Sequence, residues 1–152
     1  MPRACTCLFD SRDLKSLESP PEMLIDSLIV LIIFGNSIYA YQCIFQTQKY
    51  IEKYGFGEGS AIMTRLVGTF AAGFAVTLAI ALLTSIEGAW LLFVYGFVQA
   101  CIGAGVCYQT IHSHWGSVEG LKTSAEGYIA PVIVAILNLM VLIVGWDELF
   151  KI

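Results

Sequence analysis

The sequence predicts an all-α integral membrane protein with four transmembrane helices in an up-down-up-down bundle joined by short loops. The first observation is composition: 57% of the 152 residues are hydrophobic and only 13% are charged, about half the charged fraction of an ordinary soluble domain. The second is four apolar runs, each near the roughly 20 residues that a helix needs to cross a bilayer. The third is the short link 84–88 between the two central runs, which holds a single charge, Glu87.

The length of the chain fits one domain. Residues 1–22 are polar and mixed in charge, which predicts a flexible N-terminal tail. Residues 23–152 are expected to form the transmembrane domain, with spans at about 24–45, 63–83, 89–109 and 128–146. The five cysteines are odd in number, and three of them fall in or beside the spans, so they do not fit a disulfide framework.

The first predicted span, 24–45, is aliphatic at its centre and carries Asn36 near mid-depth and Tyr39 toward the far interface. Amides inside a membrane usually join helices by hydrogen bonds. We expect this role for Asn36, with a ligand contact as the alternative.

Residues 46–61 are expected to form an amphipathic, aromatic loop. Its glycine-rich run 55–59 has neither the ending of a P-loop nor the spacing of a dinucleotide fingerprint, so it predicts a flexible interfacial turn. Ser60 is a suitable N-cap for the next helix.

The second and third predicted spans, 63–83 and 89–109, carry small residues at a spacing of four, which lets helix backbones approach closely in lipid. The second span has the smallest side chains and is expected at the centre of the bundle. Because the link between the two spans is short, we expect them to be antiparallel neighbours. The residues expected to pack against other helices or a partner are Gly68, Ala72, Gly73, Ala75, Ala79, Gly96, Ala100, Gly103 and Ala104.

Three further polar residues fall within the predicted spans. Arg65 lies in the first turn of the second span, where it is expected to reach lipid headgroups or to pair with Glu58 or Asp26. Gln99 in the third span and Asn138 in the fourth, 128–146, are expected to be buried amides like Asn36.

The last loop, 110–127, contains His112 and His114. Histidines two residues apart can share a metal on an irregular loop but diverge on a helix, and a zinc site needs three or four ligands. We therefore predict solvent-exposed histidines and no metal site, with metal binding at this pair as the alternative.

Lysine and arginine are evenly divided between the two predicted sides, four against four, so the positive-inside rule does not decide the orientation. If translation starts at Met23, the tally becomes one against four. Loops 46–61 and 110–127 are then expected on the cytoplasmic or matrix-like side.

Several function classes are disfavoured by what the sequence lacks. The net charge is −4 and no basic cluster is present, which argues against nucleic acid as a partner. Ser113 lies between two histidines but has no placed acid or oxyanion hole in the pattern. The chain resembles small four-helix multidrug exporters in length, and these depend on a carboxylate buried in the first span, whereas Asp26 lies too near the end of its span.

These observations favour a non-enzymatic protein that serves as an accessory or structural subunit. Its expected partners are membrane lipids and a larger membrane-protein complex or a homo-oligomer, with a respiratory or photosynthetic energy-transducing complex as one setting. The first alternative is a membrane protein or enzyme that binds a lipid, quinone or pigment, although no cofactor is identified. The second is a small dimeric transporter. A ligand would be lined by Asn36, Tyr39, Arg65, Tyr95, Gln99 and Asn138.

Overall fold

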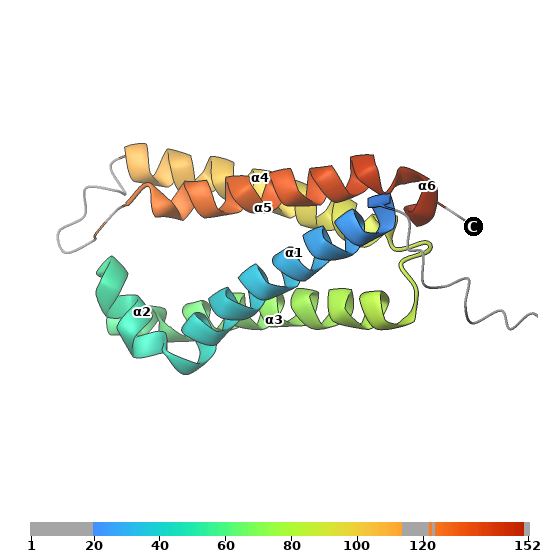
Figure 1. Cartoon of the computed structure of the whole chain (residues 1–152). Helices are drawn as coiled ribbons and strands as arrows, with labels where there is room; N and C mark the ends of the chain where they lie inside the picture. Colours follow the sequence, from blue (N-terminus) through green and yellow to red (C-terminus); the bar gives the residue numbers. More distant parts are fainter. Residues whose placement is uncertain (1–19, 114–121, 123, 151–152) are drawn as a thin grey trace, which may run out of the picture.

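The computed structural model describes residues 20–113, 122 and 124–150, and this part of the chain is helical with no strand (Figure 1). Four of its helices are long and apolar enough to cross a membrane, which confirms the predicted all-helical class. The predicted tail lies outside the described residues up to residue 19. The helices are α1 (Pro20–Phe45), α2 (Thr47–Tyr54), the 3-10 helix η2 (Glu58–Ser60), α3 (Ala61–Thr84), α4 (Trp90–His112), α5 (Glu126–Val144) and α6 (Trp146–Leu149).

The long helices form two pairs, α1 with α3 and α4 with α5, which make most of the contacts between helices. Figure 1 shows the pairs as two layers, with α2 at one end of the molecule and α6 at the other; α1 runs obliquely from α5 near α6 to α3 near α2. The layers meet mainly where α1 crosses α5. The predicted spans two and three, now α3 and α4, are consecutive in sequence but pack on different partners, so the expectation that they are packed neighbours is wrong.

Close backbone contacts explain this pairing. A Cβ atom added at Gly68 of α3 would lie 2.7 Å from Cβ of Cys43, on α1. A Cβ atom added at Gly96 of α4 would lie 2.6 Å from Oδ1 of Asn138, on α5. Each glycine thus lets its helix approach a partner that a larger side chain would keep away.

The main cluster of buried hydrophobic side chains lies in the half of the molecule that contains α6. Helix α1 supplies half of this cluster, so α1 rather than the expected α3 is the central helix. In each of the four candidate membrane spans, no more than 28% of the most apolar stretch is buried inside the protein. The buried cluster consists of Ile25, Leu28, Ile29, Ile32, Leu78, Phe93, Val141 and Leu149.

The connections differ from expectation in three places. The amphipathic stretch after the first span is largely helical, because α2 occupies Thr47–Tyr54 and ends at Gly55, which has φ 71°. Ser60 precedes α3 but makes no cap, and its Oγ is buried without a hydrogen-bond partner among the described residues. The fourth span ends at Val144, after which α6 turns back and Leu149 accepts a hydrogen bond from the Gly88 amide at 3.0 Å.

Candidate functional site

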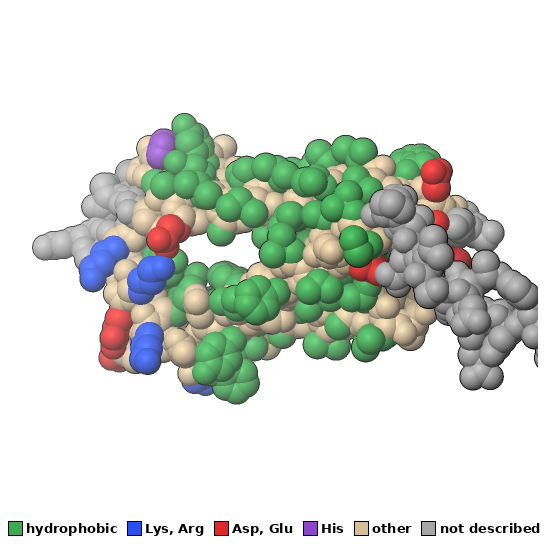
Figure 2. All heavy atoms as spheres, in the orientation of Figure 1, with side chains coloured by type: hydrophobic (Ala, Val, Ile, Leu, Met, Phe, Trp, Pro, Cys, Tyr) green, Lys and Arg blue, Asp and Glu red, His purple; other side chains and the backbone are tan. Residues whose placement is uncertain are grey.

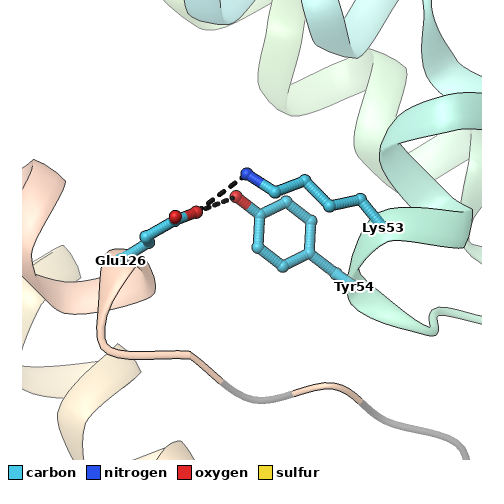
Figure 3. A network of polar contacts seen from close by, with 3 residues as sticks. All are labelled: Lys53, Tyr54 and Glu126. Atoms are coloured by element: carbon cyan, nitrogen blue, oxygen red, sulfur yellow. Dashed lines mark hydrogen bonds and ion pairs between the residues drawn. The ribbon is translucent and has the colours of Figure 1, made fainter.

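A polar bridge joins the two layers at the α2 end (Figure 3). Nζ of Lys53 lies 2.8 Å from Oε2 of Glu126, and the hydroxyl of Tyr54 donates to the same oxygen at 3.2 Å. The Lys122 amide donates to the Tyr54 carbonyl at 2.8 Å. Helix α2 is therefore connected by side chains and backbone to the segment that begins α5, more than 70 residues away in the sequence.

The bridge changes the proton affinity of its lysine. The hydrogen bond to Glu126, with a smaller contribution from Tyr54, raises the pKa of Lys53 from 10.5 to about 12. Both charged side chains are exposed, so solvent and salt screen the contact. The bridge is accordingly a reversible link and not a buried ionic lock.

Between the layers is an opening that we call the window. Figure 2 shows it in the half of the molecule that carries α2, with charged residues at its outer end. Toward the α6 half the layers touch through Phe74 of α3, whose ring lies 6.2 Å from that of Tyr95 on α4. Val67 and Phe70 precede Phe74 by seven and four residues on the same face of α3, and both are exposed.

Helix geometry places Gln99 on the face of α4 that meets Phe74 of α3. Tyr95 and Gly96 both approach Phe74, and Gln99 follows them by four and three residues, which places it on the same face of the helix. Gln99 is near the middle of α4, yet it is exposed and not buried as expected. Its side chain makes no hydrogen bond to another residue that the structure describes.

The predicted small residues have different surroundings. Gly68, Ala75, Gly96 and Ala100 are buried, whereas Ala72, Ala79, Gly103 and Ala104 are half-buried. A Cβ added at Gly103 would just reach Pro131, at 4.0 Å. Gly73 is exposed, and a Cβ added there would meet nothing within 4 Å. The predicted packing set therefore does not form one surface.

The two asparagines do not make the interhelical hydrogen bonds expected of them. Nδ2 of Asn36 donates to the Ile32 carbonyl at 2.9 Å, and Nδ2 of Asn138 donates to the Val134 carbonyl at 2.8 Å, each within its own helix. Asn138 is fully buried, and its Oδ1 has no partner among the described residues. A Cβ atom added at Gly96 would lie 2.6 Å from this oxygen, so the absence of a side chain at Gly96 makes room for the Asn138 amide.

The remaining predicted ligand residues lie apart from one another. Tyr39 packs edge-on against Tyr50 of α2, with ring centroids 6.2 Å apart. Nε of Arg65 donates to the Thr47 hydroxyl at 3.1 Å and makes neither of the predicted ion pairs with Glu58 or Asp26. Asn138 lies inside the α4–α5 contact. Of the predicted set, Tyr95 and Gln99 share the helix face toward the window.

His112 belongs to the last turn of α4 and not to a loop. Its ring packs on Tyr108, with centroids 4.3 Å apart, and also faces Tyr128. His114 lies outside the described residues. Within those residues, no three His, Cys, Asp or Glu side chains lie close enough together to hold a metal ion.

Aromatic rings gather at both ends of α4. Trp90 stacks on Phe150 at 5.3 Å near α6, and Tyr108 meets Tyr128 edge-on at 5.5 Å at the opposite end. The 18 residue steps from Trp90 to Tyr108 correspond to about 27 Å of helix. This separation matches the roughly 30 Å thickness of a bilayer's hydrocarbon core, and tryptophan and tyrosine favour its two interfaces.

Charges divide between the same two ends. In the part of the chain that the structure describes, every lysine and arginine lies toward the α2 end: Lys49, Lys53, Arg65 and Lys122. Acidic side chains are found at both ends (Figure 2). Those around α6 include Glu87, Asp147 and Glu148.

Sequence reasoning missed the bridge and the window. No sequence motif links the residues of the bridge, because the contact joins Lys53 and Tyr54 to Glu126 in a distant segment of the chain. Phe74 gave a clearer signal, because it is the one aromatic residue among the small residues 71–75. Comparison of the chain with protein-family models, curated proteins and solved structures gives no match.

Proposed function

We propose that the protein is a non-enzymatic accessory subunit that crosses a membrane four times in up-down-up-down order and binds a larger membrane protein at the window. The observation that carries the proposal is the exposed Gln99 side chain near the middle of α4, on a helix that borders the opening in Figure 2. An amide that faces hydrocarbon without a hydrogen-bond partner is unfavourable. A polar group from a neighbouring transmembrane helix would satisfy it.

A lipid tail in the window would leave the Gln99 amide unpaired, whereas a protein helix can offer a side chain or a freed carbonyl. Exposed apolar side chains on the α3 wall, such as Phe70 and Val67, would pack against the same helix. The partner is therefore expected to carry a polar residue within an otherwise apolar span.

The transporter and enzyme alternatives have less support. Proton-coupled transport needs an ionisable group within the membrane, and the cations of the described residues lie toward one end. The residues considered for a ligand site, such as Asn36, Tyr39 and Asn138, do not converge on a shared cavity. We give the accessory role precedence on these two grounds.

We further propose that the α2 end faces the cytoplasmic or matrix-like side. If translation starts at Met23, Lys and Arg at the α2 end outnumber those on the other side by four to one, which favours that side. The last described helix, α6, lies at the end of the molecule opposite α2. A reporter that is fused after Ile152 and is active only on the side away from the cytoplasm or matrix is therefore expected to give a signal. A reporter active only on the cytoplasmic or matrix-like side is expected to stay silent.

Photo-crosslinking in the native membrane tests the partner. A benzoylphenylalanine at position 99 should form one dominant adduct with a protein larger than this chain, and purification in mild detergent should recover the same protein. The matched control is the probe at Ile143, which is 67% exposed on α5 and faces away from Asn138 by helix geometry.

A stable lone monomer with no adduct at position 99 would contradict the proposal. An adduct of about twice the mass of the 16.6 kDa chain would instead indicate a homodimer and favour the transporter alternative.

A further inference from the structure

An apolar groove of about 370 Å³ lies between α1 and α3. Its walls include Tyr41 and Phe45 of α1, whose rings lie 5.5 Å apart. The α3 side of the groove consists of small or β-branched residues: Ala72, Ala75, Val76 and Ala79. An apolar groove between two helices of membrane length would be filled by the hydrocarbon chain of a lipid or by apolar side chains.

Arg65 lies at the α2 end of this groove. It precedes Ala72 and Val76 by 7 and 11 residues, so all three share one face of α3. Arginine side chains on a helix lean toward its N-terminus, which here is the interfacial end. The guanidinium is held there by the 3.1 Å hydrogen bond to Thr47, whose hydroxyl also bonds to the carbonyl of Ile44, a groove residue.

The guanidinium of Arg65 uses one donor on Thr47 and makes no ion pair with any described carboxylate. Its two terminal nitrogens are therefore available to a ligand. A guanidinium presents these donors as a planar fork that matches the oxygens of a phosphate. The cationic group and the apolar groove together match an amphiphile with an anionic head.

We propose that this groove binds an anionic phospholipid, with its phosphate on Arg65 and one acyl chain along Ala72 to Ala79. A phospholipid carries its phosphate at the membrane interface and its acyl chains deeper in the membrane. Arg65 and the apolar groove are arranged in the same order. A partner helix in the same groove would have to supply an acidic side chain opposite Arg65. The proposal rests on the insertion of α1 and α3 in a membrane but not on any protein partner at Gln99.

Native mass spectrometry of the full chain tests the site. The probes are dioleoylphosphatidylglycerol and dioleoylphosphatidylcholine, added in equal amounts to the protein in detergent micelles. The wild type should retain phosphatidylglycerol with about a fivefold preference, the factor expected for one added basic contact near a membrane surface. Arg65→Gln should abolish the preference, and Arg65→Lys should retain part of it.

Two matched pairs of variants separate the site from general effects. Lys122→Gln removes an exposed cation at the same end of the molecule and should leave the preference unchanged. Ala79→Phe fills the groove and should reduce retention of phosphatidylglycerol, whereas Ile80→Phe enlarges the neighbouring side chain, 57% exposed and outside the groove, and should not.

Equal loss of the preference in Lys122→Gln and Arg65→Gln would overturn the proposal in favour of general surface charge. No preference in the wild type would also overturn it, and this measurement does not depend on the folding of a variant. Displacement of the lipid by millimolar inorganic phosphate would show that the headgroup alone is bound and would exclude the acyl-chain site. A failed crosslink at Gln99 would leave all these outcomes unaffected.

Discussion

Lys53 and Glu126 are separated by 73 residues, yet Nζ of one lies 2.8 Å from Oε2 of the other. This contact joins α2, at the end of the α1–α3 layer, to the first residue of α5 in the α4–α5 layer. The layers are otherwise joined mainly at the opposite end, where α1 crosses α5. The bridge therefore holds the open half of the molecule together.

Glu126→Gln should loosen this end of the molecule without unfolding it. The amide at position 126 can still accept a hydrogen bond but no longer attracts the Lys53 ammonium. Hydrogen exchange of the Lys122 amide, which bonds to the Tyr54 carbonyl at 2.8 Å, should become faster.

The control for Glu126→Gln is Glu52→Gln. Glu52 accepts a hydrogen bond from Gln48 at 2.9 Å within α2, so its contact does not cross between layers. Equal acceleration of Lys122 exchange in both variants would indicate that the effect comes from α2 itself and not from the bridge.

The bridge should open at alkaline pH. Because the contact raises the pKa of Lys53 from 10.5 to about 12, its stabilising contribution is fully present below about pH 10.5 and is lost as the pH rises through 12. Lys122 protection, corrected for base-catalysed exchange with an unstructured peptide, should fall over this interval. Lys53→Gln should remove the dependence, and high salt should weaken it at neutral pH.

Hydropathy alone predicted the four long helices, because each must carry an apolar run of membrane length. The pairing of these helices could not be read in the same way. The short link 84–88 placed α3 beside α4 in sequence, but Gly68 and Gly96 approach α1 and α5 more closely. The sequence offers nine glycine and alanine residues that could each allow close helix packing. Which of them pack against another helix depends on the positions of all the helices together.

The polar residues were harder still to place. Nδ2 of Asn36 and Nδ2 of Asn138 donate to carbonyls of their own helices, a bond that an asparagine within a helix can make without a neighbouring helix. The sequence predicts Arg65 at a membrane interface, but its hydrogen bond to Thr47 depends on how α2 turns after α1. The window follows from the separation of two layers and leaves no local pattern.

Gly96→Ala should destabilise the α4–α5 contact. An added Cβ would lie 2.6 Å from Oδ1 of Asn138 and 2.8 Å from Cζ of Phe74, so at least one neighbour must move. Overpacking of this kind costs about 1 to 3 kcal/mol, which outweighs the gain of about 0.5 to 1 kcal/mol from removing a mid-helix glycine. Thermal unfolding in detergent, followed by circular dichroism, should show a lower midpoint.

Gly105→Ala is the matched control in the same helix, because a Cβ added there would meet nothing within 4 Å. Only the stabilisation from replacing a glycine within a helix applies here, so the midpoint of thermal unfolding should stay the same or rise. A lower midpoint in Gly105→Ala would show that this face of α4 is already in contact with another molecule in the micelle.

Asn138→Leu should leave the isolated protein at least as stable as the wild type. The buried Oδ1 atom has no partner among the described residues, and leaving such an atom unsatisfied costs about 1 to 3 kcal/mol. The bond from Nδ2 to the Val134 carbonyl, which the substitution removes, contributes about 0.5 to 1.5 kcal/mol. Asn138→Asp should lower the unfolding midpoint strongly, because a buried charge without a partner is far more costly. If Asn138→Leu unfolds as readily as Asn138→Asp, then Oδ1 has a stabilising contact, and the tight approach of Gly96 to this residue depends on it.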